Sequence, residues 1–282
     1  MSNPTKTPGE IYSYTVYSGH KKAETPALRL LVQGIFGGLC IALAACSTSV
    51  AVHDVSNYGL AKLIAGFTFP IGLMLIMLAG GALFTSSCLL FLNFKDHKVT
   101  LGQFFKVISI VYISNFIGAF IIALLVSYSG QLSMSYGGLA EYAIKLANTK
   151  VNIPFSQAIA SGIICNILVC SSVAFATAVT DGAGKIFAIF FSIMAFAISG
   201  VEHCVANMYY ILVGIFANSV PAYSSLVTAD TSNLNFANMI TGNLIPVTLG
   251  NIIGGLFMCF IFYFAIRDNA EFAVSKDTTK TH

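Results

Sequence analysis

Residues 60–93 read LAKLIAGFTFPIGLMLIMLAGGALFTSSCLLFLN, and no charged residue lies between Lys62 and Lys95. A helix needs about 20 apolar residues to cross the hydrocarbon core of a bilayer, so this segment is too long for one straight span. Its middle, GGALFTSS at residues 80–87, places a glycine pair just before a cluster of hydroxyl side chains. Non-helical backbone at membrane depth is tolerated only where it faces protein or a water-filled cavity. We therefore predict a membrane-spanning helix that breaks in mid-membrane.

The composition of the whole chain is that of an integral membrane protein. Of its 282 residues, 56% are hydrophobic and 9% are charged, and the mean hydropathy is +0.82. Soluble domains carry about 25% charged residues. The net charge of +3 comes without a basic tract for nucleic acid or an acidic tail, so we predict no nucleic-acid partner. The apolar runs are long and continuous, which favours helices over the short alternating strands of a membrane barrel.

Charged residues divide the chain into six apolar segments, each of which we predict to be a transmembrane helix because its backbone must satisfy its own hydrogen bonds. The segments lie between Arg29 and Asp54, Lys62 and Lys95, Lys106 and Glu141, Lys150 and Asp181, Lys185 and Asp230, and Asp230 and Arg267. The predicted organisation is an N-terminal segment 1–26, a six-helix transmembrane domain 27–267 and a tail 268–282. The mildly apolar stretch 131–153 is predicted to be an external loop with a short helix at 139–148.

The distribution of basic residues predicts the orientation. Eleven of the 14 lysines and arginines fall on the side of the N-terminus: Lys6, Lys21, Lys22, Arg29, Lys95, Lys98, Lys106, Lys185, Arg267, Lys276 and Lys280. The opposite side has Lys62, Lys145 and Lys150. Cytoplasmic loops carry the excess of lysine and arginine. We therefore expect a multi-pass protein of the cytoplasmic membrane with both termini in the cytoplasm.

The seven cysteines all fall in or beside apolar segments, and none forms a Cys-x-x-Cys pair: they are Cys40, Cys46, Cys88, Cys165, Cys170, Cys204 and Cys259. We interpret them as small apolar residues at helix contacts. Neither a disulfide framework nor a metal site is predicted, and no cofactor is expected.

The fifth segment, 185–218, repeats the design of the second. Its middle reads SGVEHCVAN at residues 199–207, so a glycine again precedes polar residues, here Glu202 and His203. Ionisable residues inside a membrane are functional candidates by default, although a structural role in capping the broken helix stays open for both. The glycine pairs Gly37-Gly38 and Gly254-Gly255 are better explained by close helix packing.

Breaks in spans two and five correspond if the chain consists of two three-helix halves of opposite topology. Matching interrupted segments of this kind point to a transport site. The new helix ends would expose backbone N–H groups, which favour negative charge. The pattern therefore predicts a channel or transporter for small monovalent anions.

The chain resembles the formate/nitrite transporter family in four ordered motifs between about residues 25 and 268. These are GGALFTS at 80–86, GIICNILVC at 162–170, SGVEHCVANM at 199–208 and NLIPVTLGN at 243–251. The resemblance implies an aquaporin-like inverted repeat and a homopentamer in which each protomer has its own pore. It implies formate as the leading substrate, because the motif at 243–251 looks closest to formate channels, with hydrosulfide or nitrite close behind.

The resemblance also implies roles for individual residues. The polar centre of the pore corresponds to Thr85, His203 and Asn166, with Asn207 and Glu202 beside it. Apolar constrictions correspond to Leu83, Phe84 and Phe196 on one side and to Phe69 and Leu73 on the other. Lys150 corresponds to the lysine of the family's vestibule and is expected to attract anions. Many family members have Asp or Glu where this chain has Ala82, which leaves the substrate open.

Four other classes of function share some of these features. A proton-coupled transporter of lactate- or acetate-type monocarboxylates is the nearest alternative, and in it His203 would control whether the anion leaves as its neutral acid. A membrane enzyme using Glu202 and His203 is a different class, but adjacent helical residues point about 100° apart and would not readily share a ligand. A receptor or purely structural protein would not need two matching breaks. A glycerol or water facilitator would need paired Asn-Pro-Ala loops, which Asn207-Met208 does not provide.

Overall fold

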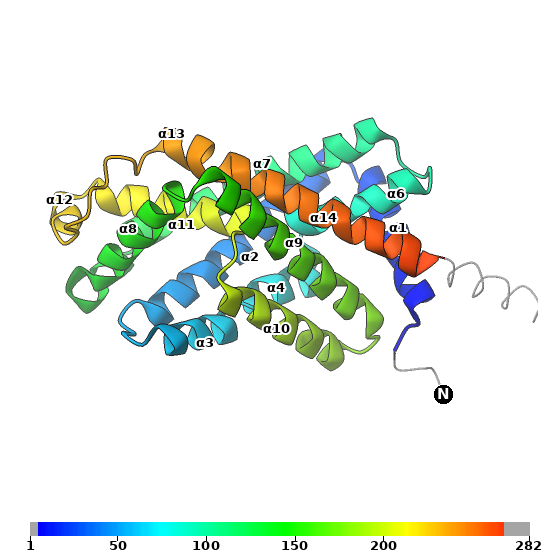
Figure 1. Ribbon diagram of the computed structural model, residues 1–282, viewed down its shortest axis with the longest axis horizontal. Coiled ribbons are helices and arrows are strands. Elements are labelled where there is room, and N and C mark those ends of the chain that lie inside the picture. The colour runs from blue at the N-terminus through cyan, green and yellow to red at the C-terminus, as the bar shows by residue number, and fades with distance from the viewer. Residues whose placement is uncertain (1–4, 268–282) are drawn as a thin grey trace, which may run out of the picture.

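The computed structural model describes residues 5–267, and the regular secondary structure of this part of the chain is helical apart from one isolated β-bridge (Figure 1). Six segments are long and apolar enough to span a membrane: Ala27–Val52, Tyr58–Ala79, Leu101–Tyr128, Phe155–Ala178, Gly182–Ser199 and Phe236–Ala265. The prediction of six spans is confirmed. The predicted tail 268–282 lies outside the described residues.

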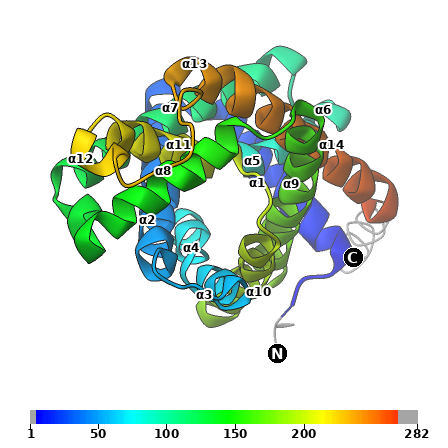
Figure 2. The ribbon, with the colours of Figure 1, turned by 60° about the vertical axis from the view of Figure 1, so that its left-hand side comes forward.

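The structural elements follow one another in this order: α1 (Pro8–Glu24), α2 (Ala27–Val52), α3 (Tyr58–Thr68), α4 (Ile71–Ala79), α5 (Phe84–Ser87), η1 (Cys88–Leu90), α6 (Phe91–Lys95), α7 (Leu101–Tyr128), η2 (Gln131–Gly137), α8 (Gly138–Val151), α9 (Phe155–Ala178), α10 (Gly182–Ser199), α11 (Cys204–Asn218), α12 (Pro221–Ser224), α13 (Phe236–Asn238), η3 (Met239–Leu244) and α14 (Ile245–Ala265). The first halves of the two interrupted spans, α3 with α4 and α10, lie side by side (Figure 2).

The two predicted breaks have the same backbone conformation. Helix α4 ends at Gly80 with φ +83°, and α10 ends at Gly200 with φ +65°. Both values lie in the left-handed region that glycine adopts without steric cost. Three residues later, Leu83 and His203 are extended, and a new helix begins directly after each of them. The glycines therefore end the first half-helices, and the chain stays open for three residues before it coils again.

The open backbone of the first break is held by Asn115, which lies in the middle of α7. Its Oδ1 accepts a hydrogen bond of 2.9 Å from the backbone N–H of Phe84. Its Nδ2 donates to the carbonyl oxygens of Ala82 at 2.9 Å and Gly34 at 2.7 Å. One buried amide side chain thus satisfies the two backbone groups that the break leaves without a helical partner, the N–H of Phe84 and the carbonyl of Ala82, and ties them to the carbonyl of Gly34 within α2.

Asn251 on α14 does the same at the second break. Its Oδ1 accepts from the N–H of Cys204 at 3.0 Å, and its Nδ2 donates to the carbonyl oxygens of Glu202 at 3.0 Å and Gly162 at 2.8 Å. The two sets of bonds correspond atom for atom. Spans one to three are therefore the structural counterpart of spans four to six, as the pattern of breaks predicted.

The stretch between spans three and four differs in detail from the predicted loop. Helix α8 begins at Gly138 and runs to Val151, so it starts one residue earlier and ends three residues later than predicted. It packs along α11 and buries one face, which includes Ala143, Ala147 and Lys150. The additional C-terminal turn carries Lys150 to the second break.

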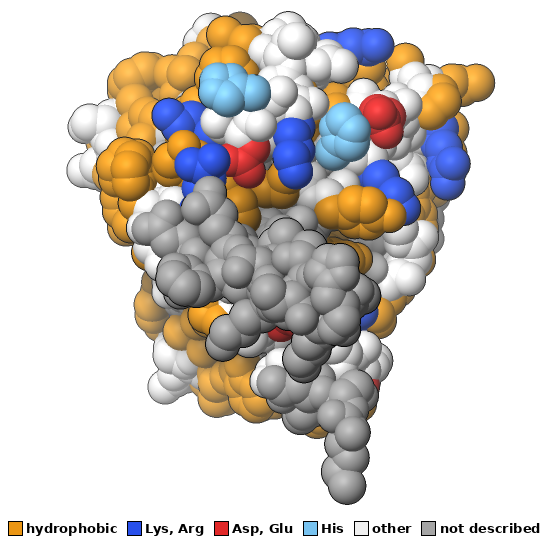
Figure 3. Space-filling view, turned by 90° about the vertical axis from the view of Figure 1, so that its right-hand side faces the viewer, with side chains coloured by type: hydrophobic (Ala, Val, Ile, Leu, Met, Phe, Trp, Pro, Cys, Tyr) orange, Lys and Arg blue, Asp and Glu red, His pale blue; other side chains and the backbone are white. Residues whose placement is uncertain are grey.

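The N-terminal segment forms a helix, α1, that folds back against the ends of other elements. A capping box between Thr7 and Glu10 begins it. The Tyr12 hydroxyl bonds Asp96 at 2.9 Å, and the Asn93 amide donates to the carbonyl oxygen of Val16 at 2.6 Å. Basic side chains gather at this end of the molecule (Figure 3).

We predict that Asn115→Ala strongly destabilises the protein. The change leaves the buried N–H of Phe84 and the buried carbonyl of Ala82 unpaired, each at a cost of about 1–3 kcal/mol. The apparent melting temperature of the purified protein in detergent should fall steeply. Ser127→Ala is the matched control on the same helix, because the Ser127 hydroxyl bonds the carbonyl of Ala123 within α7. Equal melting temperatures for the two variants would contradict the prediction.

Candidate functional site

A cavity of about 510 Å³ extends from the α2–α3 loop to the second break. The α2–α3 loop lies at the C-terminal end of α2, away from α1. Its wall includes Lys62 on α3, Lys150 on α8 and Tyr210 on α11. At its inner end lie Phe196 and His203. The cavity therefore connects one end of the molecule with the interrupted helix.

His203 joins the two breaks through its two ring nitrogens. Nδ1 accepts a hydrogen bond of 3.0 Å from the backbone N–H of Ala206, so that nitrogen carries a lone pair and the hydrogen sits on Nε2. Nε2 then donates to the Thr85 hydroxyl at 3.0 Å. The imidazole thus caps the N-terminus of α11 and presents its N–H to the segment that follows the first break.

Thr85 is fully buried beside the imidazole. Its hydroxyl oxygen accepts the His203 bond, and within residues 5–267 the hydroxyl hydrogen has no second partner. The backbone carbonyl of Thr85 is held by the amide of Asn166 at 3.2 Å. The pair can therefore offer an O–H and, when the ring turns to a ligand, an N–H to a small acceptor.

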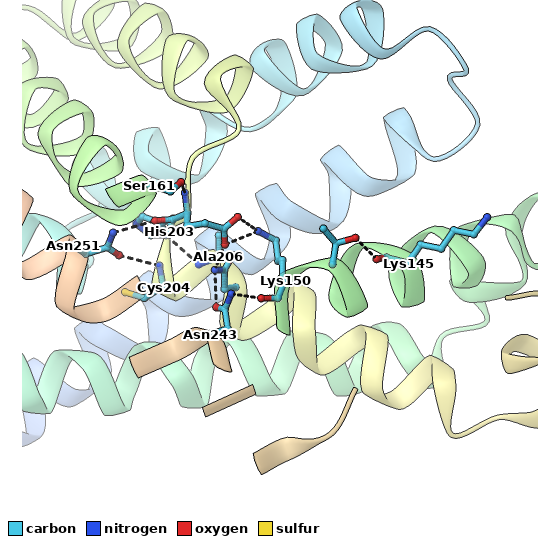
Figure 4. A network of polar contacts seen from close by, with 11 residues as sticks. Lys145, Lys150, Ser161, His203, Cys204, Ala206, Asn243 and Asn251 are labelled. Atoms are coloured by element: carbon cyan, nitrogen blue, oxygen red, sulfur yellow. Dashed lines mark hydrogen bonds and ion pairs between the residues drawn. The ribbon is translucent and has the colours of Figure 1, made fainter. Parts of the chain in front are cut away.

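Glu202 and Lys150 form a buried ion pair (Figure 4). Lys150 Nζ lies 2.9 and 3.0 Å from the two carboxylate oxygens of Glu202, and Asn207 donates to the same carboxylate at 2.6 Å. The Asn207 amide also donates to Asn243 Oδ1, and the Asn243 amide donates to the carbonyl of Lys150. Charges removed from water are tolerated when they are paired and hydrogen-bonded in this way.

The structure limits which of the predicted polar residues can donate to an anion. Both amide hydrogens of Asn166 are used, by the carbonyls of Thr85 and Asn251, and both of Asn207 are used, by Glu202 and Asn243. These amides position other groups. The expectation of exposed backbone N–H groups at the breaks is wrong for Phe84, Cys204 and Ala206, because side chains accept from all three.

Two of the predicted constriction residues meet at the wall of the cavity. Phe69 and Phe196 line the cavity with ring centroids 5.6 Å apart, and the Phe196 ring lies edge-on to His203. Phe196 thus lies beside Phe69, and its predicted grouping with Leu83 and Phe84 stays a prediction. The remaining three residues, Leu73, Leu83 and Phe84, are buried.

Sequence reasoning missed residues that the fold brings to the site. Asn115 and Asn251 occupy the same Asn-x-x-Gly pattern, with Gly118 and Gly254, and this repeat was the available signal. Asn243 lay in a quoted motif without an assigned role. Lys22 on α1 donates to the Ser87 hydroxyl at 3.2 Å, and burial lowers the pKa of Lys22 to about 8. No spacing in the sequence indicates that this lysine reaches the end of α5.

The cysteines are all buried and free. In residues 5–267, no group of three or more His, Cys, Asp or Glu side chains is arranged to hold a metal ion. The chemistry of the site therefore depends on its hydrogen-bond donors, its ion pair and its aromatic rings.

A family model described as formate/nitrite transporter matches residues 9–265. The chain belongs to this family. The formate channel FocA of Haemophilus influenzae is 33% identical over 269 residues, which cover 93% of this chain and 95% of FocA. A solved pentameric formate channel with formate bound is 30% identical, with a TM-score of 0.77, and the match covers 85% of this chain and 97% of the channel.

Membership confirms the resemblance seen in the sequence and extends it, because the match begins at residue 9 and so includes most of α1. The aquaglyceroporin of Plasmodium falciparum shares the fold, with a TM-score of 0.55 at 11% identity. The expected aquaporin-like architecture is therefore confirmed. The relatives are channels and transporters, so the protein belongs to a transport family and not to a class of enzymes.

We predict that Lys150→Met and Glu202→Gln each destabilise the protein by about 3–5 kcal/mol, because each removes one partner of the buried ion pair and leaves the other charge without its counter-charge. The double variant should recover much of the loss. Thermal unfolding of the purified protein measures both effects. The control is Lys145→Met, since Lys145 pairs with Glu141 at the surface, where ion pairs contribute less than about 1 kcal/mol. Additive losses in the double variant would show that the pair is not coupled.

Proposed function

We propose that the chain forms a channel for formate and related small monovalent anions of weak acids. The observation that carries this proposal is the bond between His203 and Thr85, which joins two half-helices at the inner end of a cavity lined by basic and aromatic residues. Family membership supports it, as does the solved formate channel that the chain resembles. Hydrosulfide and nitrite are the next candidates.

Passage depends on how the site lowers the cost of removing an anion from water, which is several kcal/mol even after relaxation. The Phe69 and Phe196 rings narrow the inner end of the cavity and displace water. The Thr85 hydroxyl and the His203 N–H then replace hydration with directed hydrogen bonds. Leu73, Leu83 and Phe84 complete the proposed apolar rings around this polar centre.

The buried Lys150–Glu202 pair positions His203 in this scheme. Glu202 directly precedes His203, and its carboxylate and backbone carbonyl are both held, by Lys150 and Asn251 respectively. The imidazole is therefore fixed at its backbone as well as through the bond to Ala206. Lys150 also lines the cavity, so its proposed attraction of anions acts together with a structural role.

The same reasoning extends to assembly and orientation. We propose a homopentamer in the cytoplasmic membrane, as in the solved pentameric formate channel. Both termini would lie in the cytoplasm, because the end of the molecule that carries α1 also carries the excess of basic residues. The cavity then opens to the outside.

We predict that Thr85→Val lowers formate flux by about tenfold or more. A hydrogen bond to a charged group contributes about 1.5–3 kcal/mol, and 1.4 kcal/mol corresponds to a factor of ten. Proteoliposomes should be tested with formate, nitrite, hydrosulfide, lactate and glycerol in turn. Thr85→Ser is the control, because it keeps the hydroxyl. Rapid glycerol flux with no anion flux in the unmodified protein would refute the proposed function.

A further inference from the structure

Three charged side chains line the cavity: Lys62, Lys150 and Glu202. Lys150 and Glu202 are bonded to each other, so the pair adds a dipole to the cavity but no net charge. Lys62 has no carboxylate partner within residues 5–267. Among the charged side chains of the cavity wall, Lys62 is therefore the one whose positive charge is not balanced by a bonded carboxylate.

The ammonium group of Lys62 lies at the cavity wall, between the start of α3 and the end of α10. The residue lies in the first turns of α3, and its ammonium reaches across to the end of α10, where a Cβ added at Gly200 would stand 2.6 Å from Nζ. The side chain is half-buried. The Tyr58 ring lies on another side, with 5.5 Å between its centroid and Nζ. The ammonium thus lies close to Gly200 and to the Tyr58 ring, and within residues 5–267 no hydrogen bond occupies its hydrogens, which are available to a ligand.

We infer that Lys62 forms an anion-entry subsite, in which a small monovalent oxyanion or carboxylate pairs with Nζ before it meets Phe69, Phe196 and the His203–Thr85 bond. This inference rests on the proposed function and adds a binding step to it. A single charge in a concave site with low-dielectric walls concentrates counter-ions. Because the subsite contains no carboxylate, the anion does not compete with a bound side chain as it would at Lys150.

A purely structural role for Lys62 makes a different prediction. A cation beside the C-terminal end of a helix interacts favourably with the helix dipole, and α10 ends at Gly200. If that were the whole role, removing the charge would lower the melting temperature, and any loss of flux would not depend on the ionic strength. An entry subsite instead acts through a field that salt screens, since the Debye length is about 10 Å at 0.1 M and about 3 Å at 1 M.

The experiment compares Lys62→Gln, Lys62→Arg and the unmodified protein in proteoliposomes. The initial rate of formate flux is measured well below saturation, at low ionic strength and again in about 1 M of a salt with an impermeant anion. Lys62→Gln should reduce the rate by about fivefold to tenfold at low ionic strength and by less than about twofold at high ionic strength. Lys62→Arg should retain most of the rate.

Lys145→Gln is the matched control, because Lys145 is an exposed lysine on α8 whose charge is paired with Glu141. It should leave the flux unchanged at both ionic strengths. An equal loss of flux at low and high salt in Lys62→Gln, or no loss at low salt, would overturn the inference. The unmodified protein reports separately on the proposed function: if it carries no anion, that proposal fails, whereas the ratio of variant to unmodified rates tests Lys62 alone.

Discussion

The architecture depends on one constraint, which is that backbone polar groups exposed in mid-membrane must find partners within the protein. Each break releases N–H and carbonyl groups that a continuous helix would have paired. Asn115 and Asn251 accept from one N–H and donate to two carbonyls each. Because those carbonyls belong to two different segments, each asparagine also fixes the distance between three spans. The spans therefore pack so closely that there is no room for a side chain at positions 34 and 162, which explains why both residues are glycine.

The two halves share this scaffold but differ in chemistry. When the two breaks are aligned, Ala82 corresponds to Glu202 and Leu83 corresponds to His203. The first half is therefore apolar at the positions where the second half is polar. The N–H of Ala82 bonds a backbone carbonyl, whereas the N–H of Glu202 bonds the Ser161 hydroxyl. The first half contributes Thr85 and the second contributes the ion pair and the imidazole. A repeat that was symmetrical in its side chains would bury a second carboxylate, for which the first half has no lysine.

Much of the fold could be predicted from the sequence, because span lengths and glycine breaks are local properties. The six spans follow from the positions of charged residues along the chain, and the two breaks follow from the glycines that precede polar residues at 80–87 and 199–207. The partners of the polar side chains could not be predicted in the same way. Whether Asn166 faces an anion or a carbonyl depends on packing between spans that are distant in the chain. The position of Lys22 depends likewise on how α1 folds back.

The structure changes the physical reason for preferring an anion. Exposed N–H groups at the helix ends were the sequence-based argument, yet side chains accept from those of Phe84, Cys204 and Ala206. One of these accepting side chains is that of His203, which accepts from the N–H of Ala206. By accepting at Nδ1, the imidazole carries its hydrogen on Nε2 and becomes a donor toward the other break. The polarity of the helix end is therefore transmitted through the ring to Thr85, and the hydrogen-bond donors that face a ligand at the inner end of the cavity depend on the tautomer of one side chain.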